Sequence, residues 1–515
     1  MKTVDLSGRP FHFIGIGGIG MSALAYVVAK RQLPVSGSDL RPNHITERLK
    51  SLGTHIFSRQ EAANLTFFLS PAKSLCEPTS AVLAGSSVGE KSTVISRLSD
   101  SFNDPALRVL PHRATSSLPQ VICSTAIEPT NLEYRAAVEM GCPIFHRSDL
   151  LAALIENYQS IAVSGTHGKT TTSSLIGYLL LMAGLDPTII VGGEVDAWQG
   201  NARIGKSNFL VAEADESDGS LIKHSPAIGV VTNIELDHPD HYQNLEEVVQ
   251  IFQLFGQQCD TLIGCLDDDN IRQNLELTIS YSLNPATGAD YTVKHVRYHA
   301  RGSTAQVWER GAYLGNLQVP LLGKHNLSNA LAAVAVGRKL GLEFPIIAEA
   351  IASFEGTKRR FERRGEANGI VFIDDYAHHP SEIKATLAAA RLRVDEDANL
   401  QRVVAVFQPH RYSRTQAFLD EFATAFGDAD IVVVTDIYSA GEENISGISG
   451  EHLAEAIPLR GCCRTAQHHP QVHYHPSLSS LSSFLQQQIL QPGDLALFLG
   501  AGNLNQQILQ IIALY

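Results

Sequence analysis

The sequence predicts an α/β fold with several domains, each built on a mostly parallel sheet. Three times along the chain, a short apolar strand leads through a glycine-rich turn into a helical stretch, which is the order of elements in parallel α/β folds. These units begin at residues 11–20, 160–172 and 369–380. Because 515 residues are too many for one hydrophobic core, we expect two to four domains.

The first unit reads FHFIGIGGIG and is followed by a helical stretch and a second strand at 34–39. Gly15, Gly17 and Gly20 have the spacing G-x-G-x-x-G, and Asp39 ends the second strand. This pattern is typical of a dinucleotide-binding turn, so an NAD-dependent oxidoreductase is one interpretation. The same turn can hold the diphosphate of another nucleotide, and the glycine pattern does not distinguish the two.

The second unit contains GTHGKTT at 165–171, between a predicted strand and a predicted helix. Backbone N–H groups and a helix N-terminus in this setting can surround phosphate oxygens. Lys169 would supply a positive charge to the terminal phosphates of ATP, and the hydroxyl of Thr170 could bind Mg²⁺. Val163 stands where the usual motif has its first glycine, so this is a shortened variant.

Acidic side chains follow two further strands that we predict in the second unit, at 208–215 and 227–233. EADESD occupies 213–218, and NIELDHPDH occupies 233–241. Because ligands bind at the carboxyl ends of parallel strands, we expect both clusters to lie near the phosphate loop. Phosphoryl transfer needs a metal ion that neutralises the γ-phosphate, and these carboxylates are candidate ligands.

The third unit continues with predicted strands at 403–410, 430–436 and 494–502. Its HHP sequence ends at Pro380, which we expect at the first position of a helix, followed by Ser381 and Glu382.

The charged segment 356–365 is the expected junction before this unit. We therefore predict domains at 1–155, 156–355 and 356–515. Residues 70–118 are rich in Ser, Pro and Ala without periodicity, and are predicted to form an insertion without visible chemistry.

Composition narrows the function further. The formal net charge of −13 argues against general nucleic-acid binding, which needs a cationic surface. The N-terminus does not have the pattern of a signal peptide, and the uncharged C-terminal stretch contains Asn and Gln, so we expect no stable membrane association. Seven cysteines without zinc spacing are consistent with a cytoplasmic protein. The sequence does not distinguish a monomer from a homodimer.

Six motifs in order along the chain resemble those of the Mur ligases. They are GTHGKTTT, EADES, NIELDH, GKHNLSN at 323–329, DDYAHHPSE at 374–382 and FQPHRYSR at 407–414. The resemblance implies a Rossmann-like N-terminal domain for a UDP-sugar, a central P-loop ATPase-like domain, and a Rossmann-like C-terminal domain for an amino acid. It covers nearly the whole chain except about 70–118.

The resemblance, together with the phosphate-loop pattern, assigns candidate residues to each ligand. The predicted ATP-binding residues are Gly165, Thr166, His167, Gly168, Lys169, Thr170, Thr171, His325, Asn326 and Asn329. The predicted UDP-sugar residues are Gly15, Gly17, Gly18, Gly20 and Asp39. The predicted metal ligands are Thr170, Glu213 and His238. The predicted amino-acid residues are Tyr376, His378, Arg411 and Arg414, and the predicted catalytic residues are Lys169, His378 and Arg411.

The activity implied by the resemblance uses ATP and Mg²⁺ to join L-alanine to the lactyl carboxylate of UDP-N-acetylmuramate, in peptidoglycan precursor synthesis. A carboxylate is a poor electrophile, so it would first attack the γ-phosphate to form an acyl-phosphate, which the amine then attacks. A relative that attaches a recycled tripeptide to the same UDP-sugar is the alternative within the family. DDYAHHPSE together with FQPHRYSR favours L-alanine.

Overall fold

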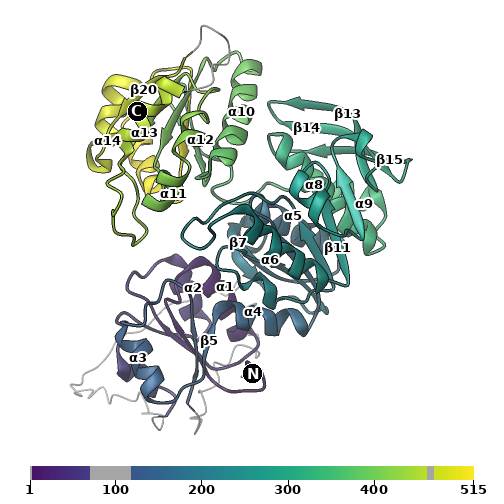
Figure 1. The fold of residues 1–515 in the computed structure, drawn as a ribbon, viewed down its shortest axis with the longest axis vertical. Coiled ribbons are helices and arrows are strands. Elements are labelled where there is room, and N and C mark those ends of the chain that lie inside the picture. Colours follow the sequence, from purple (N-terminus) through teal and green to yellow (C-terminus); the bar gives the residue numbers. More distant parts are fainter. Residues whose placement is uncertain (1–2, 70–117, 461–468) are drawn as a thin grey trace, which may run out of the picture. The chain divides into compact units, whose positions relative to one another are not determined.

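The computed structural model describes residues 3–69, 118–460 and 469–515 (Figure 1). The insertion predicted at 70–118 lies outside these residues apart from Leu118. The chain divides into two compact units. One runs to His146 except for Ser22–Val27, which belong with the second unit, Arg147–Tyr515. No helix in the described ranges is long and apolar enough to cross a membrane.

The first unit contains a five-stranded parallel sheet in the order β3-β2-β1-β4-β5. Its strands are β1 Phe11–Ile14, β2 Val35–Ser38, β3 His55–Phe57, β4 Gln120–Cys123 and β5 Ile144–His146. The helices between them are α1 Ile19–Lys30, α2 His44–Ser51 and α3 Leu132–Glu139.

A buried polar network crosses this first sheet. The carboxylate of Glu133 on α3 lies 2.8 Å from Nε2 of His12 and accepts a hydrogen bond from Asn64 Nδ2 at 2.7 Å. Ser38 also donates its hydroxyl to Glu133. All four side chains are buried, so each hydrogen bond replaces one to water that folding removed.

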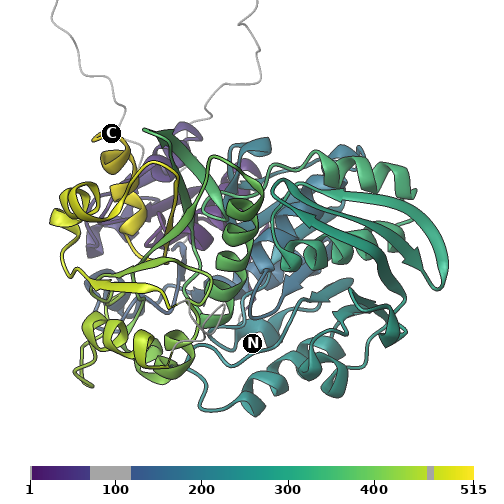
Figure 2. The ribbon, with the colours of Figure 1, turned by 90° about the horizontal axis from the view of Figure 1, so that it is seen from above.

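The second unit contains two sheets. The larger has the order β15-β14-β13-β12-β11-β10-β6-β9-β7-β8; it is parallel from β13 to β7 and antiparallel at both edges. Its strands are β6 Gln159–Ser164, β7 Thr188–Val195, β8 Gly200–Arg203, β9 Phe209–Glu213, β10 Ile228–Val231, β11 Thr261–Cys265, β12 Ile279–Ser282, β13 Tyr291–His299, β14 Gly302–Glu309 and β15 Ala312–Val319. The helices in this part are α4 Arg147–Glu156, α5 Lys169–Met182, α6 Leu245–Gln257, α7 Asp269–Asn274, α8 Lys324–Lys339 and α9 Phe344–Ala352. The long strands β13–β15 form a curved ribbon that is seen clearly in Figure 2.

The smaller sheet of this unit has the order β16-β17-β21-β18-β19-β20, and only β16 is antiparallel to its neighbour. Its strands are β16 Glu362–Ala367, β17 Ile370–Asp375, β18 Arg402–Phe407, β19 Ile431–Val434, β20 Gln471–Tyr474 and β21 Asp494–Leu499. The helices around it are α10 Pro380–Glu396, α11 Tyr412–Ala417, α12 Leu419–Ala423, α13 Gly450–Arg460, α14 Leu478–Phe484 and α15 Ile508–Ile512.

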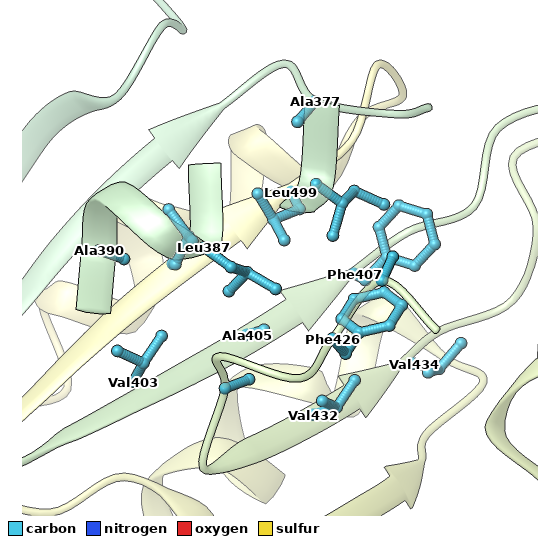
Figure 3. Packing of buried hydrophobic residues seen from close by; sticks show 14 of the residues in the cluster. Ala377, Leu387, Ala390, Val403, Ala405, Phe407, Phe426, Val432, Val434 and Leu499 are labelled. Carbon is cyan, nitrogen blue, oxygen red and sulfur yellow. The ribbon is translucent and has the colours of Figure 1, made fainter. Parts of the chain in front are cut away.

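Continuous apolar strands explain why the smaller sheet is covered on both faces. One face packs against α10, where Leu387 and Ala390 join Val403, Ala405 and Phe407 of β18 in a single buried cluster (Figure 3). A second cluster of buried residues covers the other face.

The three parallel sheets confirm the predicted α/β class, and each strand expected from the three motif-bearing units is present. The sheets lie within residues 11–146, 159–319 and 362–499. The domain boundaries at 155 and 355 stay a prediction.

Candidate nucleotide and ligation site

The predicted phosphate loop joins β6 to α5, as the sequence indicated. Gly165 and Gly168 have φ angles of +135° and +82°, a region that residues with a side chain rarely adopt. A Cβ on Gly165 would also lie 2.0 Å from Oγ1 of Thr232. The tight loop therefore requires glycine at this position.

Residues that follow β10 hold the loop from one side. The amide of His167 donates to Oδ1 of Asn233 at 2.8 Å, and Asn233 Nδ2 donates back to the carbonyl of His167 at 2.9 Å. Thr166 accepts a hydrogen bond through its hydroxyl from the amide of Glu235 at 2.8 Å. These contacts form because β6 and β10 are neighbours in the sheet, and they hold the loop backbone in place through groups of the protein itself.

Lys169 lies at the first position of α5, and its ammonium group is enclosed by acceptors. It donates to the carbonyl of Gly165 at 2.7 Å and to Glu216 at 2.9 Å. Burial opposes the charge of Lys169, but the neighbouring carboxylates outweigh it and raise the pKa of this side chain. Burial raises the pKa of Glu216 to about 7, although Lys169 works against that shift. The lysine therefore stays charged in a pocket of opposite sign.

Thr170, in the first turn of α5, and Glu213, at the end of β9, lie together. The hydroxyl of Thr170 donates to Glu213 Oε1 at 3.0 Å, and the amide of Gly192 donates to Oε2 at 2.7 Å. Glu213 ends β9, which pairs with β6 next to the phosphate loop. A hydroxyl and a carboxylate are hard oxygen ligands, so this pair fits Mg²⁺, which takes few protein ligands and keeps water or phosphate for the rest.

His238 lies in the loop after β10 and contacts Glu216, the partner of Lys169. Its Nε2 is 3.6 Å from Asp237 and 3.9 Å from Glu216. Burial lowers the pKa of His238, which favours the neutral ring that a metal ligand requires. Within the described residues, His167, Glu235 and His379 form a different group, whose possible metal-ligand atoms all lie within 4.8 Å of one another. The predicted set of Thr170, Glu213 and His238 stays a prediction.

The residues predicted to contact adenine lie at the start of α8. Asn329 reaches the phosphate loop, because a Cβ on Gly168 would lie 2.9 Å from its Oδ1. Asn326 accepts a hydrogen bond from Asn329 at 3.2 Å and donates to the carbonyl of Leu322 at 2.7 Å. His325, one residue earlier, is exposed. Thr171 follows Thr170 into α5 and is buried.

Two of the predicted amino-acid residues follow β17. His378 has its Nδ1 2.9 Å from the carbonyl of Tyr376, and burial lowers the pKa of His378 to about 4. The ring of Tyr376 lies under the guanidinium groups of Arg359 and Arg360. His378 is thus a neutral, fixed side chain at the end of the strand. The expected turn is confirmed: His379 is the N-cap of α10, Pro380 the first helical residue and Glu382 the third.

The two predicted arginines both pair with the loop after β10. Arg414 is 2% exposed and donates from Nε to Asp237 at 2.9 Å. Arg411, at a positive φ of 71°, donates to Asp240 at 2.7 Å and to Glu442 at 3.2 Å. Both guanidinium groups therefore form ion pairs with carboxylates of the protein. The carboxylate of an amino acid would be bound by the same kind of interaction.

The predicted UDP-sugar turn is built as expected in the first unit. The amide of Gly17 donates to Asp39 Oδ2 at 2.8 Å, and a Cβ on Gly17 would lie 2.7 Å from that oxygen. Gly18 closes the turn by donating to the carbonyl of Gly15 at 3.2 Å, and Gly20 is the second residue of α1. Asp39 is thus occupied in holding the loop. Leu40, the next residue, lines an open cavity of about 590 Å³ together with Arg59 and Asn131.

Three carboxylates of the site have protein partners that the sequence did not predict. Glu216 pairs with Lys169, Asp237 with Arg414, and Glu382 with His167. The first two lie inside the acidic motifs, which marked the region but not the individual partners. Glu382 could be recognised from sequence only as a helix-capping residue, because its second partner comes from a distant part of the chain.

The fold and the loop between β6 and α5 define a multidomain α/β protein of the phosphate-loop class. Three family models match successive parts of the chain: the Mur ligase family catalytic domain at 10–159, the Mur ligase middle domain at 163–337, and the Mur ligase glutamate ligase domain at 359–502. The chain belongs to the Mur ligase family.

Curated relatives match over the full length. A protein of Gloeothece citriformis named UDP-N-acetylmuramate–L-alanine ligase is 63% identical, covering 100% of this chain and 99% of its own. The solved structure of a UDP-N-acetylmuramate–alanine ligase from Thermotoga maritima is 26% identical with a TM-score of 0.74, covering 98% of this chain and 99% of that chain. A murein peptide ligase from Psychrobacter arcticus shares the fold, at 20% identity and a TM-score of 0.65 over 98% of this chain and 99% of that one.

Proposed function

We propose that the protein joins L-alanine to the lactyl carboxylate of UDP-N-acetylmuramate, with conversion of ATP to ADP and phosphate, as a step of peptidoglycan precursor synthesis. The observation that carries this proposal is the full-length similarity, at 63% identity, to a protein named for that reaction. The phosphate loop supports it, because Lys169 and the pair of Thr170 and Glu213 are arranged for a phosphorylated ligand.

In the first step, the lactyl carboxylate attacks the γ-phosphate of ATP, forming an acyl-phosphate and releasing ADP. Lys169, which carries its charge at the loop, stabilises the negative charge on the transferring phosphoryl group. Thr170, Glu213 and His238 are the proposed ligands of Mg²⁺, which when bound neutralises phosphate charge. Asn326 and Asn329 at the start of α8 would orient the nucleotide.

In the second step, the amine of alanine attacks the acyl carbon, and phosphate leaves from the tetrahedral intermediate. Arg411 and Arg414 are the proposed partners of the alanine carboxylate, since a guanidinium group binds a carboxylate through two parallel hydrogen bonds. His378, which is neutral at physiological pH, can accept the proton that the amine loses. The glycine turn around Asp39 is the proposed site of the UDP-sugar. We further propose that the protein acts in the cytoplasm, as a monomer or a homodimer.

An isotope experiment tests this proposal. With UDP-N-acetylmuramate labelled with oxygen-18 in its lactyl carboxylate, the released inorganic phosphate should carry label, because the carboxylate oxygen becomes the bridging atom of the acyl-phosphate. Unlabelled phosphate would exclude the mechanism. L-alanine should support phosphate release far better than D-glutamate or a tripeptide, and a preference for the tripeptide would identify a recycling ligase instead. The enzyme should discriminate less strongly against glycine and L-serine, since one methyl or hydroxyl group changes the binding free energy by only ~1–3 kcal/mol.

A further inference from the structure

The side chain of His167 points from the phosphate loop toward the first turn of α10 and the loop after β10. Its Nδ1 lies 3.4 Å from Oε1 of Glu382, at the start of α10, and its Nε2 lies 3.4 Å from Oε2 of Glu235, after β10. Only 15% of the side chain is exposed. The backbone of His167 is separately held by Asn233, so the loop does not need this side chain for its own shape.

The positions of the two carboxylates determine the protonation state of His167. Each ring nitrogen faces a carboxylate oxygen, and a carboxylate only accepts hydrogen bonds. A ring with a proton on each nitrogen, the imidazolium, is therefore the form that both carboxylates favour. Burial alone would lower the pKa of His167, but Glu235 and Glu382 outweigh burial and raise it to about 10.

Glu382 also organises the turn that carries the predicted amino-acid residues. Its Oε2 accepts hydrogen bonds from the amides of His378 at 3.0 Å and His379 at 3.2 Å. The other oxygen, Oε1, is the one that faces His167. One carboxylate thus caps α10, fixes the backbone of His378 and contacts the phosphate loop.

Glu235 completes a second connection between the same two regions. Its Oε2 accepts a hydrogen bond from the hydroxyl of Ser381 at 2.6 Å. The ring of His379 lies 4.7 Å from the ring of His167, and its Nδ1 is 3.9 Å from Oε2 of Glu235. The positive ring of His167 contacts both Glu235 and Glu382 and so reduces the repulsion between them. Arg360, 3.8 Å from Oε1 of Glu382, also reduces this repulsion.

We propose that His167 is a positioning residue, whose imidazolium ties the phosphate loop to the first turn of α10 and so places the amino-acid end of the site beside the phosphates. The assignment of α10 to the amino-acid end rests on the proposed function. The tie itself rests on the contacts of His167, Glu235 and Glu382. The loop backbone, which Asn233 holds, would bind ATP without this side chain, whereas the amine could not be placed without it.

A metal ion is the competing occupant of this cluster, because His167, Glu235 and His379 are close enough to share one. A metal would require His167 to give up a proton on the ring nitrogen that binds it. Nδ1 of His379 already accepts a hydrogen bond from the amide of Ser381. A protonated His167 ring, with one nitrogen facing each carboxylate, fits this arrangement better than a metal ion.

Three variants and one control test the proposal. His167→Gln removes the charge, and Glu382→Gln removes the opposing charge while keeping a residue that can cap α10. The third variant combines both changes. His452→Gln is the matched control, since His452 is exposed on α13 and contacts Ser449. The readouts are the KM for L-alanine, the dissociation constant for ATP, and the hydrogen exchange of amides 381–384 in the protein without ligands.

His167→Gln should raise the KM for L-alanine by roughly tenfold to hundredfold, the loss expected for charge-assisted hydrogen bonds. Its ATP dissociation constant should stay within about threefold of the wild-type value, since the loop backbone is held by Asn233. Exchange at 381–384 should be faster. Because both changes break the same contact, the double variant should be no worse than the more impaired single variant.

Other results would overturn the proposal. A parallel rise in the ATP dissociation constant would assign His167 to the nucleotide, and unchanged KM and exchange would show that no tie exists. A change of exchange when EDTA is added to the unmodified protein would show that a metal fills the cluster. Exchange needs no substrate, so it tests the tie even if wild-type protein releases no phosphate with L-alanine, a result that would count only against the proposed function.

Discussion

Replacing Lys169 by Ala should remove activity while leaving the fold largely intact. The ammonium group is a positive charge at the end of the phosphate loop, and it lies within 3.1 Å of two loop carbonyls and Glu216. Loss of one preorganised donor of this kind typically costs about 10²–10³ in turnover. We therefore expect ATP-dependent ligation by Lys169→Ala to fall at least about a hundredfold.

The stability cost should be much smaller, because the partner can change its charge. Glu216 is 2% exposed, and its pKa is already about 7 with Lys169 beside it. Without the lysine that lowers it, this pKa rises further, and Glu216 becomes neutral at pH 7 instead of remaining a buried, unpaired charge. The neighbouring Asp215 keeps its ion pair with Arg147 at 2.8 Å.

The raised pKa of Glu216 also determines the direction in which pH changes stability. The folded-state pKa of Glu216 lies above its unfolded value of 4.5, so the folded state binds the proton more tightly. The contribution of Glu216 to the stability of the wild-type protein therefore falls as pH rises from 4.5 to about 7, and levels off above that. In Lys169→Ala the fall should continue above pH 7, with a slope of at most ~1.4 kcal/mol per pH unit.

Phosphate release and thermal unfolding at pH 6.5 and 8.5 measure the two effects. The melting temperature of Lys169→Ala should approach that of the wild type at pH 6.5 and drop below it at pH 8.5. Lys206→Ala, which removes an exposed lysine of the same unit, should leave both quantities unchanged. Near-wild-type turnover in folded Lys169→Ala would refute the phosphate-loop assignment. An identical pH dependence of melting would refute the reasoning on Glu216.

Three further predictions concern other parts of the chain. Asp237→Asn leaves buried Arg414 without its ion-pair partner and should cost about 3–5 kcal/mol, seen as a lower melting temperature of the second unit. Glu133→Ala removes the acceptor of three buried donors; at ~1–3 kcal/mol for each group left unsatisfied, it should destabilise the first unit by at least ~3 kcal/mol, measured by hydrogen exchange in β1 and β2. Replacing residues 70–117 by a short Gly/Ser linker should keep ligation within about tenfold, because long insertions are usually tolerated, and loss of UDP-sugar binding would contradict this.

The parts of the fold that sequence could predict are those where a strand runs directly into a motif. The strands β6, β9 and β10 were expected because each is apolar and ends in glycine or acidic residues. The ribbon β13–β15 was not expected, since residues 291–319 carry no motif and pair antiparallel with one another at the edge of a sheet that is otherwise mostly parallel. Their pairing depends on neighbours in space, which local sequence does not specify.

The same limit applies to the site. The rule that ligands bind at the carboxyl ends of parallel strands predicted that the acidic cluster 213–218 would lie near the phosphate loop, and Glu213 contacts Thr170 there. It did not predict what His167 contacts, because Glu382 lies more than two hundred residues away, in the first turn of α10. Residues in a loop that directly follows a strand could be placed from sequence. Ion pairs between segments far apart in the chain, such as His167 and Glu382, could be found only in the structure.

The loop after β10 connects the two halves of the proposed chemistry. His238 in this loop lies 3.9 Å from Glu216, the partner of Lys169. Glu235 and Asp237, which shortly precede His238, contact Ser381 of α10 and Arg414 of α11. An acyl-phosphate is readily hydrolysed, so a ligase gains if phosphoryl transfer requires the amine site to be in place. A shift of α10 or Arg414 would displace Glu235 or Asp237, and because His238 lies in the same loop, the phosphate site would change as well. We therefore expect phosphoryl transfer to be fast only when α10 and Arg414 are in the positions that bind the amino acid.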